Sequence, residues 1–184
     1  MTGAMAWPVI VVMGVSGVGK TTVGQALATA IDAAFAEGDH YHPEANVAKM
    51  LRGRPLSDDD RWPWLDRLRA EIDAWLLEEK RVVLACSALK ASYRERLCPS
   101  ENAGAVRFVY LQADRDLIAG RLAARKGHYM PASLLNSQLD TLEPPRDAIT
   151  VDVNRPLDAI VDDLTTFFSP VPDDRPAALP LTKS

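Results

Sequence analysis

Residues 14–21 combine glycines and side chains that can bind phosphate. They read G-V-S-G-V-G-K-T and match G-x-x-x-x-G-K-[ST] at every fixed position, after an apolar run at 8–13 and before a stretch with helical spacing. In such a loop the backbone N–H groups surround phosphate oxygens, the lysine reaches the β- and γ-phosphates, and the threonine can hold Mg²⁺. A turn that binds nothing has no need for the Lys-Thr pair. The predicted nucleotide-binding residues are Gly14, Val15, Ser16, Gly17, Val18, Gly19, Lys20, Thr21 and Thr22, with Lys20 also catalytic and Thr21 a ligand of Mg²⁺.

The phosphate-binding loop does not reveal what receives the phosphoryl group, because GTPases, ATPases and kinases share it. A GTPase would be expected to carry an N-K-x-D segment that reads the base, and the sequence contains none. Motor-type ATPases usually have an apolar strand that ends in Asp, whereas the run at 82–85 leads into Cys86 and Ser87. A small-molecule kinase is therefore the favoured class.

A polar cluster at 37–43, E-G-D-H-Y-H-P, follows a second apolar run at 33–36. In open parallel sheets, ligands bind beyond the carboxyl ends of the strands. A carboxylate there can orient an acceptor hydroxyl and take its proton, and it can also reach Mg²⁺ through water. We predict these roles for Asp39, with a solvated acidic turn as the alternative.

Alternating elements are expected to position these groups. Short apolar runs predict strands at 8–13, 33–36, 82–85, 106–111 and 149–153. Stretches with helical spacing lie between and after them, at 21–31, 43–51, 65–80, 89–97, 117–125, 134–142 and 157–168. Ser57 and the acidic residues after it favour a helix start. This alternation predicts an α/β protein with three layers, in which a parallel sheet lies between two layers of helices.

Composition restricts the class further. With 184 residues and 47% apolar residues, the chain fits one globular domain, which we place at 1–168, before a proline-rich tail at 169–184 that we expect to be disordered. A net charge of −4 argues against nucleic acid as the principal partner. The apolar runs are too short to span a membrane, and two cysteines without an export signal favour a cytoplasmic protein.

Several separate segments together resemble the gluconokinases, which are small P-loop kinases related to shikimate kinase and the nucleoside monophosphate kinases. The longer segments are M-G-V-S-G-V-G-K-T (13–21), G-D-H-Y-H-P (38–43), P-L-S-D-D-D-R-W-P-W-L (55–65), C-S-A-L-K (86–90) and R-K-G-H-Y-M-P (125–131). Shorter matches accompany them at Asn46, at Lys49-Met50, at Tyr93-Arg94 and at T-L-E-P (141–144). The resemblance implies a five-stranded P-loop NTPase fold with a helical lid at about 121–143. It also implies a homodimer that uses ATP and Mg²⁺ to convert D-gluconate into 6-phospho-D-gluconate.

Gluconate offers one carboxylate and five hydroxyls, so its site should mix cations with neutral hydrogen-bonding groups. The segments that carry the resemblance, and the helix predicted at 134–142, supply such a set: Asp39, His42, Lys49, Arg61, Ser87, Lys90, Arg94, His128 and Gln138. Arg61 is the favoured partner of the carboxylate because its planar guanidinium suits bidentate pairing. The alternative is that Arg61 pairs only with Asp58 or Asp59. We expect Arg52 and Arg54 to be solvated. For Trp62 and Trp64 we favour a place in the core or at an interface over contact with a sugar face.

Arg121 and Arg125 are four residues apart on one predicted helix face, in the region that the resemblance identifies as the lid. We predict that both neutralise charge on the transferring phosphoryl group and that Arg125 also binds ATP. A solvated basic helix end is the alternative. By resemblance, Arg155 lies on the adenine side. A direct metal role for Glu37 is in doubt, and Cys86 is expected to be a buried apolar residue rather than a reactive thiol.

Two rival functions stay open from the sequence. One is the same machinery with another acceptor, such as shikimate or a nucleoside monophosphate. The other is a regulator that binds ATP and transfers nothing.

Overall fold

The computed structural model describes residues 8–98, 104–124 and 132–168, and within them five parallel strands form one sheet. The strands are β1 (Val9–Met13), β2 (Ala34–Glu37), β3 (Val82–Ala85), β4 (Val106–Gln112) and β5 (Ile149–Asp152). Their order in the sheet is β2-β3-β1-β4-β5. Each lies within one or two residues of a predicted strand, and the prediction of a five-stranded parallel sheet is confirmed.

Strand β1 lies in the centre of the sheet, and all of its residues are fully buried. Ile10 and Val12 pack with residues of α1 (Lys20–Ala30) and α7 (Leu157–Phe168) on one face. Val9 and Val11 pack with residues of α3 (Asp58–Leu77) and α4 (Ala91–Leu97) on the other. Burial on both faces explains why this strand is a continuous apolar run rather than an alternating one.

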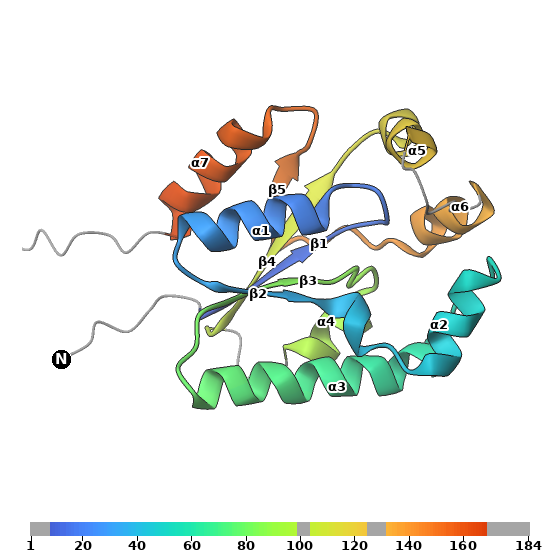
Figure 1. Cartoon of the computed structure of the whole chain (residues 1–184), viewed down its shortest axis with the longest axis horizontal. Helices are drawn as coiled ribbons and strands as arrows, with labels where there is room; N and C mark the ends of the chain where they lie inside the picture. Colours follow the sequence, from blue (N-terminus) through green and yellow to red (C-terminus); the bar gives the residue numbers. More distant parts are fainter. Residues whose placement is uncertain (1–7, 99–103, 125–131, 169–184) are drawn as a thin grey trace, which may run out of the picture.

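The helices make two layers, as Figure 1 shows, with α1 and α7 over one face of the sheet and α3 and α4 over the other. The remaining helical elements gather beyond the carboxyl ends of the strands. They are the 3-10 helix η1 (Gly38–Tyr41), α2 (Glu44–Leu51), α5 (Arg115–Ala124) and α6 (Ala132–Thr141). The three-layer α/β prediction is confirmed, and the elements that carry the polar residues of interest surround one edge of the sheet.

Helix α3 begins where Ser57 and the acidic residues after it predicted a helix start, ahead of the first apolar position at Leu65. Ser57 is its N-cap, its hydroxyl accepts a hydrogen bond from the backbone N–H of Asp60, and the Asp60 carboxylate accepts one from the backbone N–H of Ser57. This reciprocal capping box satisfies two N–H groups at the helix start. Pro63 therefore lies inside the helix rather than at its first turn. Within the described ranges, none of the helices is both long enough and apolar enough to cross a membrane.

Candidate active site

The phosphate-binding loop connects the end of β1 to the start of α1. Val15 and Val18 point into the core, so the loop is anchored by its apolar side chains. Gly19 caps α1 with φ of 110°, in the left-handed region that favours glycine. The Lys20 ammonium donates to the carbonyl of Val15 across 3.1 Å. The loop therefore curves around the lysine, with its backbone and the N-terminus of α1 facing the same space.

Thr21 and Glu37 meet at the carboxyl edge of the sheet. The Thr21 hydroxyl donates to Oε2 of Glu37 across 2.7 Å. Both groups offer the oxygen ligands that Mg²⁺ prefers. Thr21 was predicted from the loop motif, whereas a metal role for Glu37 was doubted, and the structure puts its carboxylate beside the predicted metal ligand. Thr22 is exposed.

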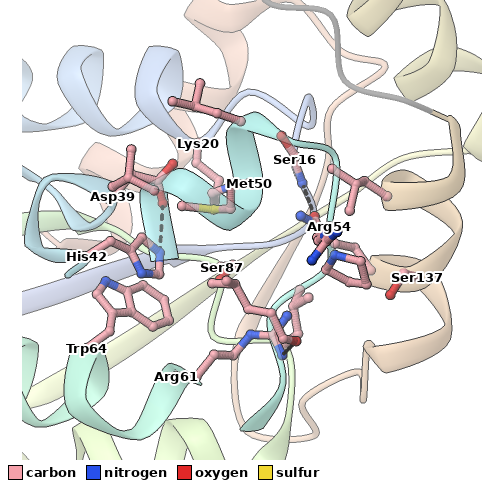
Figure 2. Close-up of a pocket in the computed structure, with 17 residues that line it drawn as sticks. Ser16, Lys20, Asp39, His42, Met50, Arg54, Arg61, Trp64, Ser87 and Ser137 are labelled. Carbon is pink, nitrogen blue, oxygen red and sulfur yellow. Dashed lines mark hydrogen bonds and ion pairs between the residues drawn. The ribbon is translucent and has the colours of Figure 1, made fainter. Parts of the chain in front are cut away.

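A cavity of about 400 Å³ opens at this edge, between the phosphate-binding loop, η1, α2, α3 and α6. This volume lies within the range of small-molecule sites in proteins. Figure 2 shows side chains from these elements around the cavity. The predicted site residues that line it are Ser16, Lys20, Asp39, His42, Arg61, Ser87 and Gln138. One cavity thus brings together the phosphate-binding loop and most of the predicted acceptor side.

Asp39 and His42 form a pair on the acceptor side, drawn with a dashed line in Figure 2. Oδ1 of Asp39 lies 3.9 Å from Nε2 of His42, and their side chains are 70% and 4% exposed. The imidazole stacks on the indole of Trp64 with a centroid separation of 4.2 Å. Burial lowers the pKa of His42 to about 4, against the opposing effect of the Asp39 carboxylate. His42 is therefore neutral near pH 7, beside a well-exposed carboxylate.

Trp64 is both a core residue and part of the cavity wall. Its side chain is buried, and its indole N–H donates to the carbonyl of Gly38 across 2.8 Å. Gly38 has no room for a side chain, because a Cβ there would lie 2.6 Å from the carbonyl oxygen of Ala85. The contact between Trp64 and Gly38 fixes the end of β2 and thereby the start of the segment that carries Asp39.

Arg61 is held at the cavity by its own neighbours. One of its guanidinium nitrogens donates to the carbonyl of Leu56 across 2.6 Å and to the hydroxyl of Tyr93 across 3.3 Å. The carboxylate of Asp58 lies 3.9 Å away. The arginine side chain is 15% exposed. Arg61 therefore both lines the cavity and contacts Asp58, which were the two alternatives that the sequence left open.

Three predicted substrate-binding cations do not line the cavity. Lys49 donates to the carboxylate of Asp60 across 2.6 Å, and Lys90 to that of Asp58 across 2.7 Å. Arg94 donates to the carbonyls of Ala88 and Leu89, each across 3.0 Å. These contacts tie α2 and α4 to the start of α3 and support the loop that carries Ser87. The three cations thus build the walls of the site.

The cavity also has lining residues that were not predicted to be site residues from the sequence. Arg54, expected to be solvated, is exposed and lines the cavity. Together with Arg54, the side chains of Val47, Met50 and Leu51 on α2 form the rim of the cavity, and the buried Leu134 of α6 also lines it. In the sequence, these residues could have been noticed only from the spacing of Val47 and Leu51, which at i and i+4 lie on one face of a helix.

Of the lid residues, Arg121 lies within the described part of the chain. Its guanidinium donates to the carbonyls of Val18 and Val153, across 3.0 and 2.9 Å, and so connects the phosphate-binding loop to the residue after β5. Arg125 and His128 lie outside the described residues. Arg155 pairs with Asp163 across 2.7 Å at the surface.

Gln138 contacts the loop directly. Its side-chain carbonyl oxygen accepts a hydrogen bond from the backbone N–H of Ser16 across 2.7 Å, shown as a dashed line in Figure 2. This N–H belongs to the set that would bind phosphate. Gln138 was predicted to bind substrate, and in the structure its side chain connects α6 to the phosphate-binding loop.

Cys86 is buried, and burial raises the pKa of its thiol to about 12. This fits the predicted role of an apolar packing residue rather than a reactive thiol.

Comparisons with known proteins agree with this geometry. Residues 9–145 match the family model described as an AAA domain. The chain is 47% identical to the gluconokinase of Gluconobacter oxydans over 166 residues, which cover 86% of this chain and 90% of that protein. The chain belongs to the gluconokinase family. The family resemblance predicted from the sequence segments is confirmed, and membership implies that the phosphate-binding loop serves a nucleotide-dependent kinase that uses ATP.

Solved structures extend the comparison to the fold. The crystal structure of a gluconokinase from Sinorhizobium meliloti is 46% identical and superimposes with a TM-score of 0.77, covering 90% of this chain and 93% of that one. A shikimate kinase from Bacteroides thetaiotaomicron is 16% identical, with a TM-score of 0.61 over 86% of this chain and 97% of that one, and therefore shares the fold alone. The gluconokinase family thus uses the same parallel sheet and helix layers as other small P-loop kinases.

Proposed function

We propose that this member of the gluconokinase family transfers the γ-phosphoryl group of ATP to D-gluconate and releases ADP and 6-phospho-D-gluconate. The observation that carries the proposal is a single cavity lined by Ser16 and Lys20 of the phosphate-binding loop and by Asp39, His42 and Arg61 of the acceptor side. A kinase needs both sets within reach of one another, because phosphoryl transfer depends on positioning and charge stabilisation.

On the nucleotide side, the loop N–H groups and Lys20 bind the β- and γ-phosphates. Arg121 joins the loop to Val153, the residue after β5, through carbonyl contacts. Arg125 adds positive charge from the lid. On the acceptor side, Arg61 binds the gluconate carboxylate, while Ser87 and His42 contact its hydroxyls. The mixture of guanidinium groups, from Arg54 and Arg61, with several neutral polar groups matches a polyhydroxy acid.

Asp39 serves as the general base for the terminal hydroxyl. The hydroxyl oxygen bonds to the γ-phosphorus, the bond from that phosphorus to the β,γ-bridging oxygen breaks, and the hydroxyl proton passes to the Asp39 carboxylate. A side chain that is 70% exposed is accessible to a substrate in the cavity. The neutral, buried imidazole of His42 lies next to it.

Mg²⁺ fits the oxygens at the loop. Among the described residues, no group of three or more His, Cys, Asp or Glu side chains could hold a metal ion alone, so the ion would be bound together with the nucleotide. Thr21 would be its direct protein ligand, with Glu37 beside it and Asp39 acting through water. Bound there, Mg²⁺ neutralises charge on the β- and γ-phosphates.

An acceptor panel tests the proposal. ADP release is measured with D-gluconate, other sugar acids, shikimate and nucleoside monophosphates at saturating ATP. Gluconate is expected to give the highest kcat/KM, and a preference for shikimate or a nucleotide would overturn the assignment. Asp39→Asn is expected to keep its fold and its ATP affinity while kcat falls by roughly a hundredfold or more. The matched control is Asp32→Asn, because Asp32 lies at the far end of α1 from the phosphate-binding loop.

A further inference from the structure

The side chain of Asn46 lies between the acceptor side of the cavity and the start of α3. Asn46 is buried, with 3% of the residue exposed. Its Nδ2 atom lies 2.7 Å from the backbone carbonyl oxygen of Asp60 and 3.3 Å from Nδ1 of His42. A buried amide placed between two polar partners has a fixed orientation, because turning it would leave polar groups unsatisfied.

The carbonyl of Asp60 decides which atom of the amide faces it. A carbonyl oxygen can only accept a hydrogen bond, so the atom 2.7 Å away must be the NH₂ nitrogen of Asn46 and not its oxygen. The same nitrogen has a second hydrogen, which is available to His42. The assignment of the amide therefore follows from its partner.

The tautomer of His42 follows in turn. An amide nitrogen donates and does not accept, so the Nδ1 atom that faces it must carry a lone pair. A neutral imidazole with a lone pair on Nδ1 carries its proton on Nε2. A protonated ring has no such lone pair and would turn a second N–H toward the Asn46 donor, so the contact itself requires a neutral ring. The N–H of the neutral ring therefore lies on the nitrogen nearest to Asp39.

We propose that Asn46 is a positioning residue that holds His42 in the Nε2–H tautomer, so that His42 donates a hydrogen bond to the acceptor hydroxyl while Asp39 accepts the proton of that hydroxyl. The inference rests on the proposed function in one respect, the presence of an acceptor hydroxyl. Oδ1 of Asp39 and Nε2 of His42 are 3.9 Å apart, so a hydroxyl oxygen can lie about 2.8 Å from both.

The arrangement separates the roles of the two side chains. A hydroxyl is at once a donor and an acceptor, so it is matched by one acceptor, Asp39, and one donor, His42. With the opposite tautomer, the hydroxyl would face two acceptors and could donate to only one of them. His42 in the Nε2–H form has no lone pair on that side and cannot take the proton. The base is therefore Asp39, and His42 orients the hydroxyl by donating a hydrogen bond to its oxygen.

The first test is spectroscopic and needs no substrate. Nitrogen NMR of the full-length protein, labelled with ¹⁵N at the histidine rings and assigned with His42→Gln, reports which ring nitrogen of His42 carries the proton near pH 7. We expect protonated Nε2 and bare Nδ1. In Asn46→Asp the carboxylate accepts instead of donating, so the proton is expected on Nδ1. A proton on Nδ1 in the wild-type protein would overturn the proposal whatever the activity.

The second test is kinetic. Asn46→Asp is expected to lower kcat by roughly tenfold or more, with the KM for ATP unchanged, because the hydroxyl loses its donor. In a His42→Gln background, where the amide can donate regardless of position 46, the same change should have a much smaller effect. A wild-type kcat in a variant whose spectra show the proton on Nδ1 would refute the role.

Two controls separate this proposal from other failures. Thermal unfolding and ATP binding by Asn46→Asp identify a loss of fold, and Asn46→Ala repeats the kinetic test without a new charge. If the wild-type protein does not phosphorylate gluconate, the proposed function fails, yet the NMR spectra still decide the tautomer.

Discussion

The hydroxyl of Thr21, in the first turn of α1, donates to Oε2 of Glu37, the last residue of β2, across 2.7 Å. The contact joins the phosphate-binding loop to the acceptor segment, because η1 and Asp39 follow Glu37 directly. A carboxylate beside the proposed ligand of Mg²⁺ adds negative charge where a divalent cation would bind with the nucleotide.

Glu37→Gln is therefore expected to raise the Mg²⁺ concentration needed for half-maximal activity by about tenfold, since the amide can still accept from Thr21 but has lost its charge. Titration of activity with Mg²⁺ at fixed ATP measures the effect. Glu44→Gln, which neutralises an exposed carboxylate on α2, is the matched control. An unchanged Mg²⁺ profile in Glu37→Gln would assign this carboxylate to positioning Thr21 alone.

Tyr93 is predicted to support Arg61. Its hydroxyl accepts from Arg61 across 3.3 Å and donates to the Asp58 carboxylate. Tyr93→Phe removes both contacts and keeps the ring, so the KM for gluconate is expected to rise by about fivefold with little change in kcat. Tyr110→Phe, in strand β4, controls for the loss of a hydroxyl from a buried tyrosine. A change confined to kcat would mean that Arg61 does not act in substrate binding.

Gln138 is expected to compete with ATP for the phosphate-binding loop. Its side-chain oxygen accepts from the Ser16 N–H, which ATP phosphate must take over. Gln138→Ala should therefore lower the Kd for ATP by about threefold, the equivalent of one modest hydrogen bond. Calorimetric titration without acceptor measures this Kd, with Asn136→Ala on the exposed face of α6 as the control. Weaker ATP binding would show that Gln138 assists the nucleotide instead of competing with it.

The stability of the protein is expected to depend on the ionisation of Asp60. Hydrogen bonds from Lys49 and from Ser57 lower the pKa of this carboxyl from 3.8 to about 2 in the folded protein. A carboxyl with a lowered folded pKa stabilises the fold above its unfolded pKa, and this contribution is lost as pH falls from about 3.8 through about 2. The capping box and the contact between α2 and α3 both depend on the charged form.

Asp60→Asn should accordingly lower the melting temperature by several degrees at pH 7, and the difference from wild type should narrow toward pH 2.5. Thermal unfolding across this pH range is the measurement. Asp59→Asn, the exposed neighbour, controls for the removal of one negative charge from the helix start. A difference that stays constant with pH would attribute the loss to amide packing rather than to charge.

The fold could be predicted from the sequence wherever one local rule decides the structure. The run at Val9–Met13 is buried on both faces, and the glycines and Lys20 of the loop follow it at fixed spacing. The carboxyl ends of parallel strands meet at one edge, so Asp39 and Ser87 were predictable as neighbours of the loop. These predictions needed only the order of the elements.

The carboxylate that each cation contacts could not be predicted from the sequence. Three consecutive aspartates at 58–60 have Lys49 before them and Arg61 and Lys90 after them. The spacing in the sequence does not tell which of these cations contacts which carboxylate. The answer depends on how α2 and α4 lie against the start of α3, where Lys49 meets Asp60 and Lys90 meets Asp58. Contacts made across separate helices are tertiary, and no pattern within one helix encodes them.

The exposed residues at the rim of the cavity contribute less to the stability of the fold than the buried residues around it. Leu51 on α2 is 82% exposed and Arg54 is exposed, although both line the cavity. Substitutions there leave the hydrophobic core intact, whereas changes at Trp64 or Asn46 remove buried contacts. Directed evolution of acceptor range therefore has two rim positions that tolerate broad randomisation, and a library built on them should retain folded members even when most of its changes are radical.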